Sequence, residues 1–353
     1  MNEIIGITKK LKIIIILSIL LFIGLVSGLF IMYGPIPTFR EWLITTAMTT
    51  MNHQYLATWF YSDETITEVM DKHKVIEVAE ITNPELIQIP STIVVDMQKE
   101  NSVMVYANEY ERQILQRDPE HPEYKIIDIK GSGYSGYLAV IYDPARISVV
   151  TTKNLGKSGQ YLVNMAKENN AIVAINGGGF DDPNYSSNGS TPIGTTIVNG
   201  EIKTSYGYYS STGGIVGFTY DNKLVLGKMS AQEALDMGVR DAVTFGPFLI
   251  VNGKSSFVRG NGGWGEAPRT AIGQRQDGIV LLLVIDGRTL TRPGADMGDL
   301  TEIMENYGAY NAANLDGGNS SALIINNELI NHPINWDEKE ETRPIATGFI
   351  LTK

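Results

Sequence analysis

The sequence contains no cysteine and only four histidines, and these shortages exclude several kinds of chemistry. Without cysteine there is no disulfide and no catalytic thiolate. No pair of histidines has the spacing of zinc ligands, so a histidine-based metal centre is not expected. Basic stretches are missing outside the extreme N-terminus, and the formal net charge is −11. Nucleic acid is therefore not expected as a partner, because phosphate binding needs clustered lysine and arginine.

Familiar nucleotide-binding and hydrolase motifs are missing as well. There is no P-loop, no G-x-S-x-G turn, and no tandem repeat. The triple glycine Gly177–Gly179 lacks G-x-G-x-x-G spacing and precedes no helical pattern, which argues against a dinucleotide-binding fold.

One long apolar run lies near the N-terminus. Residues 13–33 carry no charged side chain, which is enough length to cross a bilayer as a helix. Lys9, Lys10 and Lys12 precede it and favour a cytoplasmic N-terminus. The alternative is a cleavable signal peptide, but its apolar core would usually be shorter and no clear Ala-x-Ala site follows. We expect a single-pass cell-membrane protein whose chain from Thr38 onward lies outside the cytoplasm.

The remaining chain divides by pattern. Thr38 to Glu41 reads as a capping box for a helix to about Tyr61, and a second box at Thr65 opens a helix to about Lys74. We predict four parts: a cytoplasmic tail (1–12), a transmembrane anchor (13–34), a juxtamembrane helical and linker region (35–123) and a large folded domain (124–353).

From Tyr124 onward, turn dipeptides separate apolar runs. Four hairpin signals occur, at Asn199-Gly200, Asp221-Asn222, Asn252-Gly253 and Asn326-Asn327. Three helices are expected among them: one capped by Ser158, one opened by a capping box at Ser230, and one carrying Leu300 to Tyr307 and ended by Gly308. The sequence thus predicts an α+β fold, a large mainly antiparallel or mixed β-sheet domain with a few flanking helices.

Three apolar runs end in glycine beside polar groups. They are 171–175 before Asn176-Gly177-Gly178, 279–285 before Asp286-Gly287-Arg288, and 309–315 before Asp316-Gly317-Gly318-Asn319-Ser320. Each alone could be an ordinary turn, because Asp-Gly and Asn-Gly favour turns. The threefold repetition instead predicts one site assembled from distant strand ends, where backbone is open to a ligand.

A further candidate follows the glycine-rich loop 259–265. Pro268 leads into Arg269 and Thr270 at the start of another apolar strand. A planar guanidinium suits bidentate binding of phosphate or carboxylate, whereas the alternative is a salt bridge to an acidic neighbour.

In this order, the motifs resemble those of the phosphodiester glycosidase family. The matching segments are Asn176–Phe180, Gly194, Gly246-Pro247, Pro268–Gly273, Val284–Arg288, Glu302, Asn314–Ser321 and Arg343-Pro344. They cover roughly residues 124–353. Two positions depart from the family pattern: Asn319 stands where a third glycine is usual, and Gly179-Phe180 stands where Phe-Phe is frequent.

The resemblance implies cleavage of a sugar-1-phosphodiester, of the α-N-acetylglucosamine-1-phosphate type, at the anomeric carbon. Asp316, Asp286 and Arg269 are the implied catalytic residues. The implied substrate-binding residues are Asn176, Gly177, Gly178, Gly194, Thr270, Arg288, Gly317, Gly318, Asn319, Ser320, Glu302 and Arg343. The substrate expected is a phosphorylated glycan of a cell wall or exopolysaccharide.

The residue types suit such a reaction. A phosphomonoester leaves as a stable anion and needs charge stabilisation more than a proton, which we assign to Arg269 and backbone amides. One aspartate would act at the anomeric carbon as base or nucleophile, with Asp316 the first choice and Asp286 the second. Inversion and retention both stay open, because they depend on carboxylate separation. No cofactor is certain, although Asp286 and Asp316 could hold Ca²⁺ or Mg²⁺.

Two other kinds of protein remain open from the sequence. One is a membrane-tethered glycan-binding protein without turnover, and the other is a metal-dependent phosphodiesterase that cuts P–O instead of C–O.

Overall fold

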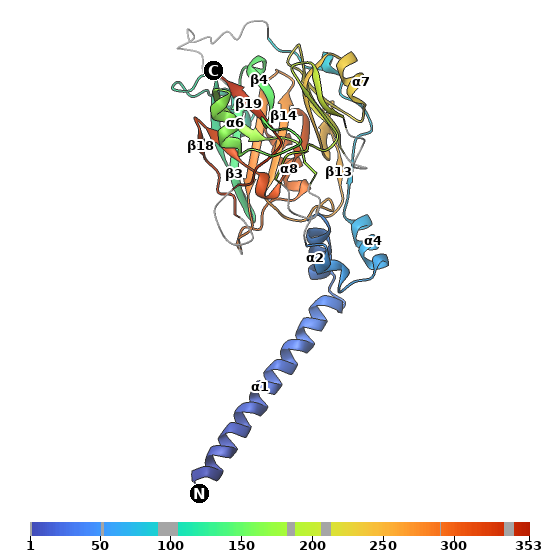
Figure 1. Ribbon diagram of the computed structural model, residues 1–353, viewed down its shortest axis with the longest axis vertical. Coiled ribbons are helices and arrows are strands. Elements are labelled where there is room, and N and C mark those ends of the chain that lie inside the picture. The colour runs from blue at the N-terminus through green and yellow to red at the C-terminus, as the bar shows by residue number, and fades with distance from the viewer. Residues whose placement is uncertain are drawn as a thin grey trace. The chain divides into compact units, whose positions relative to one another are not determined.

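The computed structural model describes residues 2–50, 53–90, 105–181, 188–205, 213–289, 291–334 and 342–353, with backbone alone for residues 2–10. The chain forms two compact units, Met1–Asp71 and Lys72–Lys353 (Figure 1).

The first unit is helical. It contains α1 (Asn2–Tyr33), α2 (Thr38–Met48), α3 (Tyr55–Thr58) and most of α4 (Asp63–Lys72). Leu11–Tyr33 of α1 has a mean hydropathy of 3.0, none of it is buried, and it is long and apolar enough to cross a membrane.

Both capping boxes predicted in this unit are wrong in detail. Pro37 occupies the cap of α2 without a side-chain hydrogen bond, and α2 stops at Met48 before α3 begins. The helix expected from Thr65 begins earlier, at Asp63, and the Ser62 hydroxyl accepts a hydrogen bond from the Thr65 amide at 3.3 Å.

The second unit is built on three larger sheets and a short β-pair, and every strand pair among the described residues is antiparallel. The seven-stranded sheet has the order β12 (Lys254–Ser255), β11 (Phe248–Val251), β16 (Ala309–Leu315), β14 (Arg269–Arg275), β15 (Val280–Asp286), β3 (Tyr134–Ile141), β2 (Tyr124–Gly131). One five-stranded sheet has the order β18 (Glu328–Leu329), β17 (Leu323–Ile325), β5 (Ala171–Asn176), β19 (Thr347–Thr352), β4 (Ile147–Thr151). The other has the order β7 (Glu201–Ser205), β6 (Thr195–Val198), β10 (Val239–Phe245), β8 (Gly214–Thr219), β9 (Leu224–Gly227). The pair is β1 (Val75–Ile76) with β13 (Phe257–Val258).

Four helices among the described residues of this unit pack on the sheets. They are α5 (Glu109–Leu115), α6 (Leu162–Glu168), α7 (Ala231–Asp236) and α8 (Met297–Asn306), with short 3₁₀ turns at Pro84–Leu86, Pro144–Arg146 and Gly318–Ser320. The α+β prediction is therefore confirmed, with antiparallel pairing throughout the described strands.

Alternation along β15 shows how the core is layered. Leu282 and Val284 pack into a cluster shared by all three large sheets, together with Ile175 of β5 and Phe218 of β8. Leu281, Leu283 and Ile285 point to the opposite face, where α8 packs on them through its own apolar side chains. Successive side chains of a strand face opposite sides, so the seven-stranded sheet separates an inter-sheet core from a core beneath α8.

The predicted hairpin turns are confirmed. All four hairpin dipeptides join consecutive strands, and the asparagines Asn199, Asn222, Asn252, Asn326 and Asn327 adopt positive φ. The capping box at Ser230 is present in α7, and Gly308, with φ of 77°, follows α8 as predicted. The third helix differs, because Tyr161 and not Ser158 precedes α6.

The second unit begins well before Tyr124. Val75 pairs with Val258, and the Glu77 carboxylate accepts hydrogen bonds from the amides of Gly213 (2.6 Å) and Phe248 (2.7 Å). The segment that follows α4, which the sequence placed in the juxtamembrane region, is thus attached to the sheets.

Candidate active site

The strand register brings two of the predicted strand ends to one edge of the seven-stranded sheet. Thr270 of β14 lies opposite Val284 of β15 on one side and opposite Leu315 of β16 on the other. Asp286 and Asp316 follow those two residues closely, so both carboxylates lie at the edge where β14 begins. Because β14 lies between β15 and β16, the backbones of these two outer strands are separated by roughly 10 Å.

Asn176 joins the third strand end to this edge from the neighbouring sheet. Its side-chain amide donates to the Asp316 carbonyl at 2.6 Å, and its oxygen accepts from the Thr270 hydroxyl at 2.7 Å and the Ala322 amide at 3.2 Å. The Asp316 amide donates in turn to the Gly177 carbonyl at 3.2 Å. Asn176 is 1% exposed, so its amide connects four chain segments within the protein and positions Asp316.

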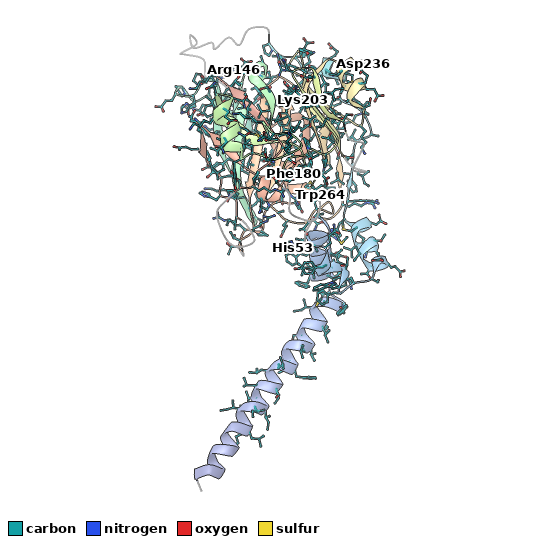
Figure 2. All side chains as sticks on the ribbon, viewed as in Figure 1. His53, Arg146, Phe180, Lys203, Asp236 and Trp264 are labelled. Carbon is teal, nitrogen blue, oxygen red and sulfur yellow. The ribbon has the colours of Figure 1, made fainter. Side chains whose placement is uncertain are left out.

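Asp316 forms an ion pair with an arginine from the last part of the chain. Nη2 of Arg343 lies 3.2 Å from Oδ2 of Asp316, and Nε donates to the Ser320 hydroxyl at 2.8 Å. The Arg343 guanidinium also lies over the ring of Phe180, 4.5 Å from its centroid. Phe180 is labelled in Figure 2, among the strands of the second unit. Three contacts thus hold Arg343 beside the carboxylate, while about a third of its side chain stays exposed.

Arg288 brings a second guanidinium to the same place. Its pKa is lowered to about 10, because burial and the nearby charge of Arg343 lower it more than the charge of Asp316 raises it. Its Nη1 donates to the Ile334 carbonyl at 3.3 Å. Gly318 has φ of 61°, and a Cβ there would lie 2.8 Å from Nη2 of Arg288. Glycine at this position therefore permits both the turn and the close approach of the guanidinium.

Asp286 is held by a segment that the sequence did not single out. Its Oδ1 accepts from Nδ2 of Asn331 at 2.9 Å and from the amide of His332 at 3.0 Å. The same Nδ2 donates to the Ser321 carbonyl at 3.1 Å, which links Asp286 to the loop after Asp316. No local pattern marks Asn331, because its role depends on a contact 45 residues away.

Arg269 lies on the other face of the sheet, which argues against a direct role in phosphate binding. Its neighbour Thr270 points into the inter-sheet core, so alternation directs Arg269 toward α8. There its Nη2 donates to the carbonyls of Trp264 and Gly265, both at 2.6 Å, and its Nε to Ala295 at 3.1 Å. The side chain is 5% exposed, and burial lowers its pKa to about 10. Arg269 therefore ties the glycine-rich loop to the start of α8.

Glu302 is also placed away from the strand ends. It is an exposed residue of α8, the helix that covers the face opposite the inter-sheet core. The substrate-binding role expected for Glu302 has no geometric support.

The glycines expected at the site lie where side chains would collide. A Cβ at Gly177 would lie 2.6 Å from Oγ1 of Thr347, and one at Gly178 would lie 2.7 Å from the Thr244 carbonyl. Gly194 has φ of 64° and packs against the Thr244 side chain. A Cβ at Gly317 would lie 2.8 Å from the Pro268 carbonyl. These glycines permit close packing of the strand ends. Asn319 lies in the 3₁₀ turn Gly318–Ser320.

A Ca²⁺ or Mg²⁺ ion held by Asp286 and Asp316 has little support in the geometry. Over the described ranges no group of three or more histidine, aspartate or glutamate side chains could hold a metal ion. Asp286 and Asp316 each direct a carboxylate oxygen to protein donors. We therefore assign no reaction step to a metal.

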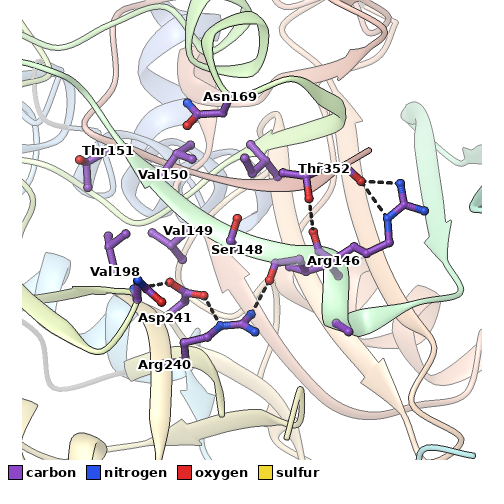
Figure 3. A pocket seen from close by; sticks show the side chains of 14 residues that line it. Arg146, Ser148, Val149, Val150, Thr151, Asn169, Val198, Arg240, Asp241 and Thr352 are labelled. Atoms are coloured by element: carbon purple, nitrogen blue, oxygen red, sulfur yellow. Dashed lines mark hydrogen bonds and ion pairs between the residues drawn. The ribbon is translucent and has the colours of Figure 1, made fainter. Parts of the chain in front are cut away.

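A hollow of about 520 Å³ borders the sheet that contains β5, at the end of β19 that is far from Asn176 (Figure 3). It borders Ile147 and Thr352, whereas Asn176 pairs with Gly348 at the opposite end of β19. Arg240 in this hollow bonds Asp241 at 2.7 Å and the Ile147 carbonyl at 2.5 Å. The charge of Arg240 is thus paired with that of Asp241.

Comparisons with known proteins agree on one family. A family model described as phosphodiester glycosidase matches residues 169–352, just over half of the chain. The SPbeta prophage-derived uncharacterized protein YomE of Bacillus subtilis is 30% identical over 179 residues, covering 48% of this chain and 27% of that protein. N-acetylglucosamine-1-phosphodiester alpha-N-acetylglucosaminidase of Mus musculus is 26% identical over 231 residues, covering 58% of this chain and 42% of that enzyme. The chain thus spans less than half the length of these relatives.

Among solved structures, the catalytic domain of the zebrafish N-acetylglucosamine-1-phosphodiester alpha-N-acetylglucosaminidase, auto-inhibited by its pro-peptide, superposes with a TM-score of 0.53. The match has 23% identity and covers 65% of this chain and 82% of that one. At this identity the likeness supports the fold.

Proposed function

Because this chain belongs to the phosphodiester glycosidase family, we propose that it hydrolyses a sugar-1-phosphodiester of the α-N-acetylglucosamine-1-phosphate type at the anomeric carbon. The substrate proposed is a cell-wall or exopolysaccharide glycan. We further propose that α1 anchors the protein in the cell membrane, with the catalytic unit outside the cytoplasm.

The charge around Asp316 is the observation that carries this proposal. Arg343 and Arg288 bring two guanidinium groups close to the Asp316 carboxylate, so positive charge is concentrated next to Asp316 in a chain with a net charge of −11. The mutual repulsion of two partly buried cations would be relieved by an anionic ligand. Guanidinium groups also match the oxygen geometry of phosphate.

In the proposed reaction the bond between the anomeric carbon and the phosphate oxygen breaks, and water supplies the new oxygen on that carbon. The phosphomonoester leaves as an anion beside Arg343 and Arg288, where preorganised positive charge stabilises it. Asp316 acts at the anomeric carbon, either as base for the water or as nucleophile. Asn176 and Ser320 act through other groups, by fixing the Asp316 backbone and the Arg343 guanidinium.

The deciding experiment uses the full chain in detergent and an α-N-acetylglucosamine-1-phosphodiester, either UDP-linked or aryl-linked, in ¹⁸O-labelled water. We expect turnover with the label in the sugar, and loss of turnover in Asp316→Asn. Label in the phosphate product would show P–O cleavage and replace this proposal with a phosphodiesterase. Saturable glycan binding with no turnover would replace it with a binding protein.

A further inference from the structure

Large aromatic side chains cluster on the helical unit just after α1 and are left uncovered. From Gly34 to Ser62 the only charged residues are Arg40 and Glu41. Five aromatic residues in this stretch are exposed: Phe39 (39%), Trp42 (42%), Tyr55 (40%), Trp59 (74%) and Phe60 (43%). We call these five residues the aromatic collar.

The collar is not needed for the packing of the helices themselves. The unit has its own small core, made of Ile44, Ala47, Ala57, Tyr61, Ile66 and Val69. Four of the collar residues instead form two pairs at the surface. The rings of Phe39 and Trp42 lie 5.7 Å apart, and those of Tyr55 and Trp59 lie 4.7 Å apart. Exposed aromatic surface of this extent marks a face that meets another phase or molecule.

Hydrogen bonds fix the collar at the end of α1. The Tyr33 hydroxyl donates to the Phe60 carbonyl at 2.9 Å, and the Tyr61 hydroxyl donates to the Met32 carbonyl at 3.3 Å. The rings of Tyr33 and Tyr61 lie 5.8 Å apart. The apolar stretch of α1 ends at Tyr33, and α2 follows it in the chain (Figure 1). The collar therefore begins, along the chain, where the hydrocarbon of a bilayer crossed by α1 would end.

Tryptophan and tyrosine favour the headgroup region of a bilayer, because their rings are apolar while their N–H and O–H groups need polar partners. The near absence of charge between Gly34 and Ser62 suits the same environment. We propose that the aromatic collar lies in the outer headgroup layer of the membrane that α1 crosses, so that its partner is a lipid surface. This inference rests on the membrane anchoring proposed above, and it is independent of the reaction.

The collar would give the helical unit a second contact with the membrane, at its surface, in addition to the transmembrane helix. The second unit begins at Lys72, directly after this unit in the chain.

Depth-dependent quenching tests the proposal on the full chain. The protein is reconstituted in phosphatidylcholine and phosphatidylglycerol vesicles whose acyl chains carry bromine atoms either near the headgroups or near the bilayer centre. Trp42 and Trp59 are two of the four tryptophans, so shallow bromines should quench up to about half of the emission and deep bromines much less. Trp42→Phe/Trp59→Phe is the matched variant, and it should lose that quenching.

Equal quenching in the wild type and the double variant would overturn the proposal. Blue-shifted emission from Trp42 and Trp59 without bromine quenching would also overturn it and assign the collar to a protein surface, such as a second copy. Carbonate extraction of the same vesicles reports separately whether α1 is inserted. Failure of the anchor is thereby distinguished from failure of the collar.

Discussion

At the scale of single residues, Asp316 is the carboxylate on which the proposed reaction depends most. Its backbone is fixed by Asn176 and Gly177, and its side chain by Arg343. Asp286 is less suited to act on a substrate, because Asn331 and the His332 amide both bond its Oδ1.

We expect Asp316→Asn to fold normally and to lose about 10²- to 10⁴-fold in kcat, the typical contribution of a positioned acid, base or nucleophile. An amide oxygen can still accept the Arg343 hydrogen bond, so the melting temperature should change little. Asp128→Asn, at an exposed position of β2, is the control and should keep wild-type kinetics. Full activity in a folded Asp316→Asn protein would remove Asp316 from the mechanism.

The two arginines Arg343 and Arg269 should respond differently to removal. Arg343→Ala should lower kcat/KM on a glycosyl phosphodiester about tenfold to a hundredfold, the value of one charge-assisted hydrogen bond. An aryl glycoside, whose leaving group carries no phosphate, should lose less, and Arg343→Lys should recover only part of the activity.

Arg269→Ala should instead destabilise the fold by about 3 kcal/mol, because three carbonyls, two of them buried and one partly buried, lose their donor. Its melting temperature should fall, and both activities should fall alike. A selective loss on phosphodiesters in Arg269→Ala, or equal losses in Arg343→Ala, would reverse this assignment.

At the scale of elements, α7 and α8 begin with the same capping box but in different surroundings. Asp299 of α8 is half-buried, and burial raises its pKa to about 6, with the charges of Asp296, Glu266 and Glu302 adding to the effect. Glu233 of α7 is fully exposed, and hydrogen bonds from Ser230 lower its pKa.

These opposite shifts give opposite dependences on pH. The folded state holds the Asp299 proton up to a higher pH than the unfolded chain, in which the pKa of this carboxyl is near 3.8. The contribution of this group to stability is therefore lost as pH rises from about 4 through 6. Asp299→Asn should therefore gain about 1 kcal/mol relative to the wild type between pH 4 and pH 7, after allowance for partial exposure.

Glu233→Gln is the matched control and should shift the other way, because its contribution is lost as pH falls. Thermal unfolding at pH 4 and pH 7 measures both differences. If the two variants changed in the same direction, burial of the Asp299 carboxyl would not be the cause.

At the scale of the whole molecule, the membrane part and the candidate site are separate in the chain. Every residue assigned to the site lies between Asn176 and Arg343, inside the second unit, while the apolar helix lies in the first. Attachment and catalysis should therefore be separable.

A chain that starts at Gly34 should keep the wild-type kcat/KM on a small soluble phosphodiester. It should lose the stable anchoring that α1 gives and bind vesicles only weakly and reversibly through the aromatic collar. Flotation and a soluble-substrate assay of the same preparation check both parts. Loss of activity toward the soluble substrate would show that α1 contributes to the catalytic unit.

Local patterns were enough for much of the architecture. Asparagine and glycine turns fixed all four hairpins, and the apolar period identified α8, because these features depend on neighbours in the chain. The order of strand-end motifs pointed to the family for a similar reason: each motif is a short stretch whose glycines and polar groups can be recognised directly.

The sequence by itself therefore determined the four hairpin turns, the helices α7 and α8, and the candidate strand ends of this protein. Only the tertiary structure decided which side chains meet. Register and strand alternation directed the Arg269 guanidinium to backbone carbonyls of the glycine-rich loop and of Ala295, and they left Glu302 on the outer face. Long-range packing brought Arg343 to Asp316 and Asn331 to Asp286. The physical reason is that turns and helix caps depend on residues a few positions apart, whereas a site depends on which faces of distant strands are turned toward one another.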